Sequence, residues 1–522
     1  MPLFAGIDIG TTSTIGILVD ETGQVIARAS RDCDLHSEQP TWAEEKPAQW
    51  WDNTCAILGE MLARADAGDV AAIGVTGMVP ALVALDEAGN VLRRSIQQND
   101  ARTTREVAEI AAEIDESEFL AKTGNGINQQ LVAPRLRWLA RHEPESFARI
   151  ATVMGSYDYV TWRLSGVRQV EHNWALEAGF IYVAAGRLDP GLIALGHIDP
   201  ALVPPVHASH EVVGAVTPEA ASATGLKTGT PVVAGCADHV ASAFVAGVVE
   251  KGDLLIKFGG AGDVLLASPS PVTDRRMFLD YHIVPGLFLT NGCMAASGSV
   301  LKWVAREFAA AEVAAAEAAG ESVYARLDRL AAGTTPGAGG LVLLPYFLGE
   351  KTPLHDPYAR GTLVGLALHH GLAHVWRAAL EAVVFGFRHH IDVFADMGLD
   401  VARVVASDGG SASELWMQIA ADALQRPVQL VDGHPGSSLG AAFVAAMGIG
   451  ALDDWGAIAR YVKPGRIVQP NPTHKPRYDE AYALYRETYD RLKPLYPRLA
   501  ALGGQINKPT CAPGDHRETR GT

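Results

Sequence analysis

The chain has 522 residues and a formal net charge of −16, with 48% hydrophobic and 20% charged residues. One hydrophobic core rarely organises so long a chain, so we expect two large domains. The negative charge argues against nucleic acid as a partner, because a phosphate backbone would repel it. The five cysteines are scattered without a CxxC pair and no apolar run of about 20 residues occurs, which predicts a cytoplasmic protein that does not enter a membrane.

The first thirty residues predict a β-meander whose first turn could bind phosphate. Apolar runs at residues 3–9 and 15–19 flank a turn of glycine and hydroxyl residues at 10–13, and a third run covers 25–29. Glycine lets backbone N–H groups point inward and hydroxyls add donors, as a phosphate requires. Asp8, at the end of the first run, could hold Mg²⁺ through water. A plain hairpin would use the same residues, so both interpretations stay open.

Asp238 lies at the polar tip of an expected strand at residues 231–239, ahead of a helix of small residues at 240–248. Ligands bind at the carboxyl edge of strands in open α/β sheets, and a carboxylate there can take a proton from a hydroxyl. A helix N-cap is the commoner role for such an aspartate. Earlier in the chain we expect helices at 47–64, 103–113 and 135–141, and strands at 71–75 and 82–85.

The opening pattern returns about 250 residues later. A strand at 252–258 leads into the turn of Gly259 and Gly260, and a second strand at 263–267 runs back. Two such units suggest two related halves that each present a hairpin to a shared cleft. Further on, Gly409 and Gly410 follow a strand, where glycine lets a flat ring or a phosphate approach the backbone, although a tight βα connection would look the same.

We therefore expect two domains, at residues 1–250 and 251–500. The polar, Gly/Pro-rich segment 501–522 is expected to be a mobile tail. The other elements expected in the second half are a helix at 307–319, a strand at 340–344, a helix at 373–394 and a strand–turn–helix unit at 404–423.

The stretch GTLVGLALHHGLAHVWRAALE, which begins at Gly361, resembles the C-terminal signature of the FGGY carbohydrate kinases. That family belongs to the sugar kinase/actin/heat-shock ATPase superfamily, and the resemblance extends from Gly6 to about Tyr496. It implies an α/β fold of two ribonuclease H-like domains, with ATP, Mg²⁺ and a small sugar in the cleft between them. It also implies that residues 1–250 form the sugar-binding and catalytic domain and residues 251–500 the nucleotide-binding domain. The signature positions are Gly361, Leu363, Gly365, Leu366, His374, Val375, Ala378 and Glu381.

The resemblance also implies roles for the matching residues. Asp238 would be the catalytic base that deprotonates the acceptor hydroxyl, and Asp8 would assist Mg²⁺, through water. Nucleotide contacts would come from Gly10, Thr11, Thr12, Ser13, Gly259, Gly260, Gly298, Gly409 and Gly410. Sugar contacts are expected from Met78, Val79, Gln98, Asn99, Asp100 and His239.

Within the family the chain is most similar to xylulokinase-like members, which implies phosphorylation of D-xylulose to D-xylulose 5-phosphate. Pro80 stands where those members carry a sugar-contacting histidine, Gln98 where they carry a tryptophan, and Gly260 where they carry a threonine. The first two changes touch the sugar site and the third touches the nucleotide site. Ribulose, ribitol, erythritol and glycerol therefore stay open as substrates, and a homodimer stays open as the assembly.

Three rival interpretations remain. Residues 436–440 fit the G-x-S-x-G pattern of serine hydrolases, but a loop separates them from the preceding strand, which favours a plain helix start. His370 and His374 have the i, i+4 spacing of metal ligands, although such histidines more often cap a helix. A non-catalytic protein that only senses sugar and ATP would keep the same fold.

Overall fold

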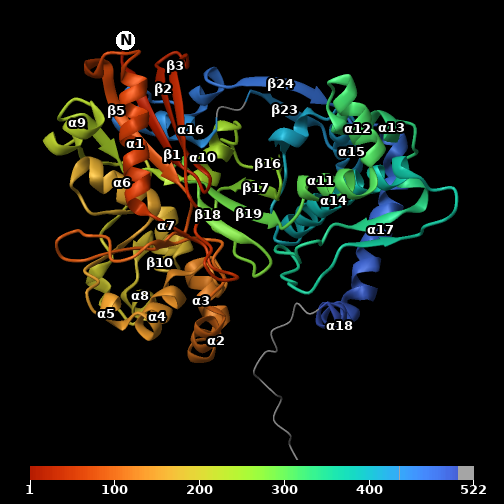
Figure 1. Cartoon of the computed structure of the whole chain (residues 1–522), viewed down its shortest axis with the longest axis horizontal. Helices are drawn as coiled ribbons and strands as arrows, with labels where there is room; N and C mark the ends of the chain where they lie inside the picture. The colour runs from red at the N-terminus through yellow and green to blue at the C-terminus, as the bar shows by residue number, and fades with distance from the viewer. Residues whose placement is uncertain (434–435, 504–522) are drawn as a thin grey trace, which may run out of the picture.

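The computed structural model describes residues 1–433 and 436–503, which form two lobes side by side (Figure 1). Each lobe is built on one seven-stranded sheet with helices packed against it. Of the predicted tail, residues 501 and 502 belong to helix α18, and residues 504–522 lie outside the described part. Within the described ranges, no helix combines the length and the apolar character needed to cross a membrane.

The first sheet contains the predicted β-meander. Its central strand β1 pairs antiparallel with β2 and parallel with β5, so the turn after β1 opens at the carboxyl edge of both β1 and β5. The strand order is β13-β14-β5-β1-β2-β3, and β15 also pairs with β5. The bounds are β1 Leu3–Ile9, β2 Ser13–Asp20, β3 Val25–Asp32, β5 Val70–Gly77, β13 Val212–Ala215, β14 Pro231–Val233 and β15 Cys236–Ala237.

The second sheet repeats the arrangement at the centre of the first. Strand β16 pairs antiparallel with β17 and parallel with β22, as β1 does with β2 and β5. The order is β18-β19-β17-β16-β22-β23-β24, so β18 forms one edge of this sheet. The bounds are β16 Asp253–Phe258, β17 Gly262–Ser268, β18 Phe278–Tyr281, β19 Phe288–Met294, β22 Arg403–Ser407, β23 Val428–Asp432 and β24 Lys463–Val468.

The helices agree with the predicted ones to within a few residues at most ends. In the first half they are α1 Pro47–Leu62, α2 Thr104–Glu113, α3 Glu116–Thr123, α4 Val132–His142, α5 Pro144–Phe147, α6 Ser156–Ser165, α7 His172–Glu177, α8 Pro190–Ala194, α9 Pro218–Thr224 and α10 Asp238–Val245. In the second they are α11 Gly298–Phe308, α12 Ala310–Ala319, α13 Val323–Ala332, α14 Leu372–Asp396, α15 Glu414–Leu424, α16 Ser437–Gly448, α17 Lys475–Leu492 and α18 Tyr496–Leu502.

Short strand pairs complete the fold: β4 (Glu44–Glu45) with β7 (Ser95–Ile96), β6 (Val83–Leu85) with β8 (Thr152–Met154), β9 (Val170–Glu171) with β12 (Val206–His207), β10 (Ile181–Tyr182) with β11 (Arg187–Leu188), and β20 (Val342–Leu344) with β21 (Thr362–Val364).

Two predicted elements are divided in the structure. The strand expected at 231–239 splits into β14 and β15, because Gly235 has a φ of 96° and lies so close to β5 that a Cβ there would be 2.2 Å from the carbonyl oxygen of Val75. The helix expected at 307–319 is broken at Ala309, which separates α11 from α12. Both breaks arise from local backbone geometry that an apolar pattern does not record.

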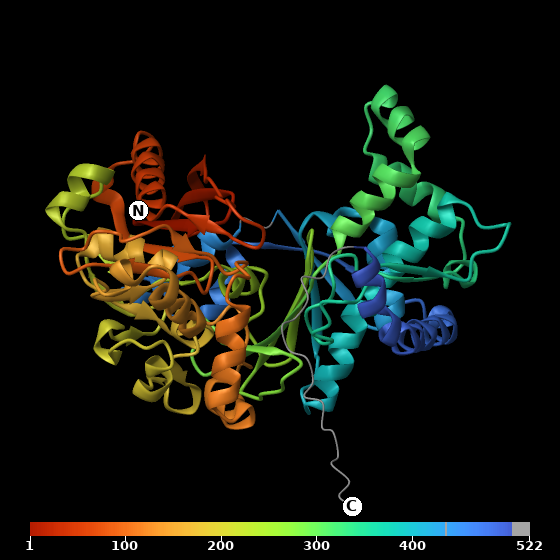
Figure 2. The same cartoon turned by 60° about the horizontal axis from the view of Figure 1, so that its bottom comes forward.

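Helix α16 comes from the second half of the sequence but packs on the first sheet, against β1, β5 and α10. Both views agree: the blue helix lies among the red strands in Figure 1 and again in Figure 2. Glycines make this close approach possible. A Cβ on Gly6 would lie 1.9 Å from the carbonyl oxygen of Ser438, and one on Gly74 would lie 2.3 Å from that of Ala441.

The first lobe buries an acidic side chain, Glu171, at the end of β9. Its carboxyl group is fully buried and accepts hydrogen bonds from Tyr157 Oη at 2.8 Å, Ser209 Oγ at 2.9 Å and the Asn173 N–H at 2.8 Å. Burial raises its pKa from 4.5 to about 7, although these hydrogen bonds pull in the opposite direction. At slightly acidic pH the folded protein therefore holds a proton that the unfolded chain has lost.

This proton makes the stability of the fold depend on pH. Between about pH 5 and 7, each unit of rising pH should destabilise the folded protein by up to about 1.4 kcal/mol through Glu171. A Glu171→Gln variant cannot ionise and should lack this loss. The difference between the thermal unfolding midpoints of Glu171→Gln and the wild type should therefore increase from pH 5 to pH 7. For the control Glu219→Gln, at an exposed site, the same difference should not change with pH. A flat difference for Glu171→Gln would contradict the prediction.

Candidate active site

A cavity of about 1020 Å³ is lined by residues from both halves of the chain. The strand ends of the first sheet and the start of α10 contribute one part of its wall, and the hairpin β16–β17, strand β18 and the loop after β22 contribute another. The lining includes Val79, Gln98, Asn99, Glu177, Asp238, His239, Lys257, Asp263, Asp280, Asn291, Lys351, Asp408, Ser437 and Arg466.

Asp238 is the first residue of α10, directly after β15 at the carboxyl edge of the first sheet. The residue in the N-cap position is Ala237, so the alternative that Asp238 caps the helix does not describe this structure. Its Oδ1 accepts the N–H of His239 at 2.6 Å. Burial alone would raise the pKa of Asp238, but this contact, the charge of His239 and that of Lys257 lower it overall. The carboxylate is therefore ionised at neutral pH and able to accept a proton.

Asp8 lies one residue before the end of β1, close enough to Asp238 for the two carboxyl groups to interact electrostatically. Its Oδ2 accepts a hydrogen bond from Ser437 Oγ at 2.6 Å, whereas Oδ1 is buried with no hydrogen-bond partner. Burial and the charge of Asp238 raise the pKa of Asp8 to about 7. A buried, unpaired carboxylate oxygen beside a second carboxylate is a donor set that suits a hard divalent cation such as Mg²⁺.

The predicted phosphate loops lie after β1 and after β16. In the first loop the Gly10 N–H donates to the Ser13 carbonyl at 3.0 Å, which closes a tight turn. In the second, the Gly260 carbonyl accepts the N–H groups of Ser297 and Ser299. Gly298, at the start of α11, packs on this second loop, because a Cβ there would lie 2.8 Å from the Gly259 carbonyl oxygen.

The predicted nucleotide contacts Gly409 and Gly410 follow β22. A Cβ on Gly410 would lie 2.5 Å from the Trp416 ring and 2.7 Å from Phe258, so packing requires glycine at this position. Gly409 has open space around it, which leaves its backbone accessible. Asp408 lines the cavity with a φ of 70°, an uncommon conformation for a residue other than glycine.

Four of the six predicted sugar contacts line the cavity: Val79, Gln98, Asn99 and His239. Met78 and Asp100 are not among the residues that line it. Asp100 pairs with Arg102 at 2.6 Å and accepts the Ala43 N–H at 2.7 Å. These partners turn its carboxylate into the protein, and sugar contact by Met78 or Asp100 stays a prediction.

The sequence analysis missed several cavity residues with charged or titratable side chains, among them Lys257, Glu177 and Asp280. Lys257 interrupts an apolar strand and faces Asp263 across the β16–β17 hairpin at 3.6 Å, so a lone lysine in such a run was an available signal. Glu177 ends α7, and Asp280 lies on β18. Their contact with His239 joins segments far apart in sequence, and local patterns carry no signal for it.

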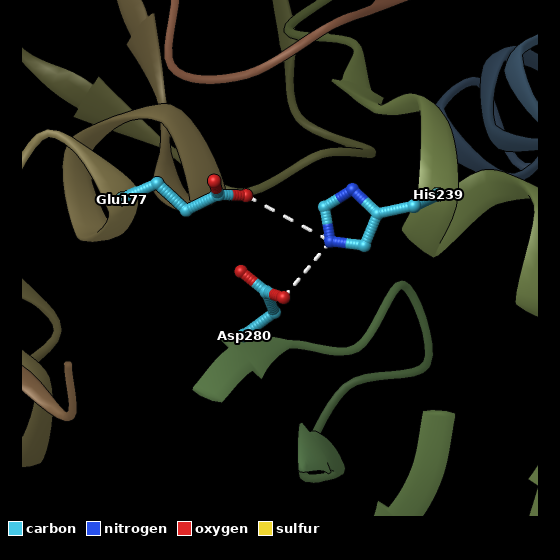
Figure 3. A group of neighbouring side chains, drawn as sticks. All are labelled: Glu177, His239 and Asp280. Atoms are coloured by element: carbon cyan, nitrogen blue, oxygen red, sulfur yellow. Dashed lines mark hydrogen bonds and ion pairs between the residues drawn. The ribbon is translucent and has the colours of Figure 1, made fainter. Parts of the chain in front are cut away.

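Figure 3 shows how the side chains of Glu177, His239 and Asp280 meet. His239 Nε2 lies 2.9 Å from Asp280 Oδ2 and 3.7 Å from Glu177 Oε1, and its Nδ1 lies 3.5 Å from Asp238 Oδ1. Burial lowers the pKa of His239, but the charge of Asp280 and the side-chain hydrogen bonds with Asp238 and Asp280 hold it well above its usual value. His239 is therefore a cation that connects the proposed base to a second acidic group.

The structure also bears on two rival interpretations. Ser438, the serine of the G-x-S-x-G pattern, is 1% exposed and lies in α16 beneath β1, so the pattern marks a helix start here. His374 Nδ1 accepts the Gly371 N–H at 3.2 Å at the start of α14, which is the capping arrangement.

Comparisons with known proteins agree with this geometry. The family models for the N-terminal and C-terminal domains of the FGGY family of carbohydrate kinases match residues 3–245 and 255–449. A crystal structure of xylulose kinase from Rhodospirillum rubrum is 52% identical, with a TM-score of 0.90 over 95% of this chain and 100% of that chain. Xylulose kinase from Escherichia coli (strain K12) is 30% identical over 95% of this chain and 100% of its own length. Gluconokinase from Bacillus subtilis (strain 168) is 26% identical over 95% of each.

Two related α/β lobes with a shared cavity are the architecture of the actin-like ATPase fold, and the predicted fold is confirmed. The chain belongs to the FGGY family of carbohydrate kinases. It is therefore a sugar kinase that uses ATP.

Proposed function

We propose that this kinase transfers the γ-phosphoryl group of ATP to D-xylulose, giving D-xylulose 5-phosphate and ADP, with Asp238 as the general base. The observation that carries this proposal is the ionised Asp238 carboxylate at the start of α10, on the wall of a cavity shared by both lobes. The 52% identity to the xylulose kinase from Rhodospirillum rubrum supports the choice of sugar.

In the proposed reaction, Asp238 accepts the proton of the 5-hydroxyl as its oxygen attacks the γ-phosphorus. The new O–P bond forms while the bond from the γ-phosphorus to its bridging oxygen breaks, and ADP leaves. Backbone N–H groups of residues 11–13 and 259–260 orient the phosphates, and Lys257 supplies positive charge beside Asp238. Such catalysis depends mainly on positioning and on charge stabilisation.

Residues 1–250 would form the sugar-binding and catalytic domain, and residues 251–500 the nucleotide-binding domain. The phosphate loops of both lobes would contact the nucleotide. Asp8, with its unpaired Oδ1, would hold Mg²⁺ through water. Bound there, the ion would neutralise charge on the transferring phosphate. Sugar hydroxyls would meet Val79, Gln98, Asn99 and His239 on the cavity wall.

Gluconate is a second candidate substrate, because a gluconokinase aligns over nearly the whole chain. Other ketopentoses and polyols also remain candidates, since Pro80 and Gln98 differ from the xylulokinase pattern at the sugar site. A non-catalytic sensor would bind ATP and sugar without turnover.

The test is ADP release with MgATP across xylulose, ribulose, ribitol, erythritol, glycerol and gluconate. We expect kcat/KM for D-xylulose to exceed that of every other compound by at least about tenfold, as a site that pairs each substrate hydroxyl discriminates strongly. A different preferred compound would replace xylulose in the proposal. If the protein binds ATP but releases no ADP with any compound of the panel, a non-catalytic sensor of sugar and ATP is favoured.

A further inference from the structure

A fixed carboxylate, Asp280, projects from the second sheet onto the sugar side of the cavity. It lies on the edge strand β18, yet it contacts His239 of α10, the residue after the proposed base (Figure 3). Its Oδ2 also accepts a hydrogen bond from Asn291 Nδ2 at 2.5 Å. Asp280 is therefore held by elements of both lobes. It contacts His239, which directly follows the proposed base Asp238 in the sequence.

Two asparagines hold the backbone on either side of Asp280. Asn125 donates to the Leu279 carbonyl at 3.0 Å and accepts the Leu279 N–H at 2.9 Å. Asn173 donates to the Tyr281 carbonyl at 3.0 Å and accepts the Tyr281 N–H at 2.7 Å. Each side-chain amide thus takes the place of a neighbouring strand at the edge of the sheet. Asp280 is anchored before and after itself, so its carboxylate cannot easily withdraw from a ligand.

Two oxygen atoms of this cluster are buried without a hydrogen bond: Asp280 Oδ1 and Glu177 Oε1. Both residues line the cavity. Burial and the charge of Asp280 hold the pKa of Glu177 well above its usual value. The nearby amide side chains on the wall are uncharged and include Gln98, Asn99, Asn125, Asn128 and Gln130.

This arrangement favours one chemical class of ligand. A hydroxyl group can donate to the free oxygen of Asp280, which relieves an unsatisfied buried acceptor. A ligand carboxylate would meet a like charge in a partly buried site, where screening is weak. His239 adds positive charge, but its ring is already shared between Asp238 and Asp280.

We propose that Asp280 is a specificity-determining residue that restricts this kinase to uncharged sugars and polyols and excludes sugar acids. The inference rests on the proposed function in one respect, that the sugar binds in this cavity. It does not depend on which uncharged sugar is the substrate.

The test compares two ligands that differ in charge but share one carbon skeleton, D-xylonate and its neutral amide, D-xylonamide. Binding of each to the full-length protein is measured by calorimetry without nucleotide, in EDTA. We expect the amide to bind the wild type at least about tenfold more tightly, and this ratio to fall by at least about fivefold in Asp280→Asn. Equal binding of both ligands by the wild type, or failure of the amide to bind, would overturn the proposal.

Matched variants separate charge from shape. Asp280→Glu keeps the charge and should keep most of the discrimination, whereas Glu219→Gln removes an exposed carboxylate and should change nothing. An unchanged ratio in a folded Asp280→Asn protein would overturn the proposal. If that variant does not fold, the comparison of the two ligands on the wild type decides the matter.

A cation would reverse the expected preference. Glu177, His239 and Asp280 place one ligand atom each within 4.8 Å of one another, a spacing that could hold a metal ion. The titrations are therefore repeated with MnCl₂. Tighter binding of xylonate with Mn²⁺, lost in Asp280→Asn, would identify a cation site and overturn the exclusion of acids. If another uncharged sugar gives the highest kcat/KM in the substrate panel, that sugar replaces xylulose in the proposed function, and this inference is unaffected.

Discussion

Replacing Asp238 by alanine is expected to slow phosphoryl transfer by about 10²–10⁴-fold while leaving ATP binding intact, because it removes the general base and touches no nucleotide loop. The measurement is kcat with the best substrate of the panel, together with ATP affinity by calorimetry. The loss should appear in kcat rather than in the affinity for ATP, since proton transfer matters only as the hydroxyl attacks.

Asp238→Asn is the matched control for shape. It retains an oxygen that can accept the His239 N–H, which Asp238 accepts at 2.6 Å, but it cannot take up a proton as a carboxylate does. The Asn variant should therefore be about as inactive as the Ala variant and should unfold near the wild-type temperature. Activity close to that of the wild type in either variant would refute the assignment of the base.

Replacing Gly6 by alanine should produce the largest loss of stability among the changes considered. The added Cβ would lie 1.9 Å from the Ser438 carbonyl oxygen and 2.7 Å from the Ala442 nitrogen, both of them backbone atoms of α16. Either β1 or the helix must shift, which should destabilise the fold by about 3 kcal/mol. Activity should fall as well, because β1 also carries Asp8.

Gly59→Ala is the matched control. Gly59 lies within α1 on its exposed side, and a Cβ there would have no atom within 4 Å. Alanine favours a helix over glycine by about 1 kcal/mol, so this variant should be as stable as the wild type or more so. Thermal unfolding of both variants tests the pair. Equal midpoints for Gly6→Ala and the wild type would show that α16 can move away from the sheet without loss.

The sequence predicted the segments that are defined locally in the chain. The turns at residues 10–13 and 259–260 each follow an apolar strand, and Asp238 directly follows another, so strand patterns and glycines were enough to locate them. Their contacts with substrate and nucleotide stay predictions. The division of the strand at 231–239 was not predictable, because it depends on how closely Gly235 approaches β5.

The acidic side of the cavity could not be predicted for a different physical reason. Asp280 reaches His239 only because β18 is docked against α7, and two asparagines remote in sequence hold it there. Nothing near Asp280 in the chain records those contacts. Asp100 shows a related difficulty, since its ion pair with Arg102, which turns the carboxylate inward, is not indicated by the polar character of the residue alone.

The position of α16 has a consequence for how this protein is made. The glycine-lined surface of the first sheet is covered by residues 437–448, so a ribosome that has completed the first 250 residues has not yet supplied its cover. At about 5–20 residues per second, roughly 10–40 s of translation separate the two events. During that interval an apolar β-surface is open to chaperones and to other nascent chains. A frameshift or a premature stop before residue 437 would therefore release a chain whose first lobe lacks its cover, although every strand of the first sheet had been synthesised.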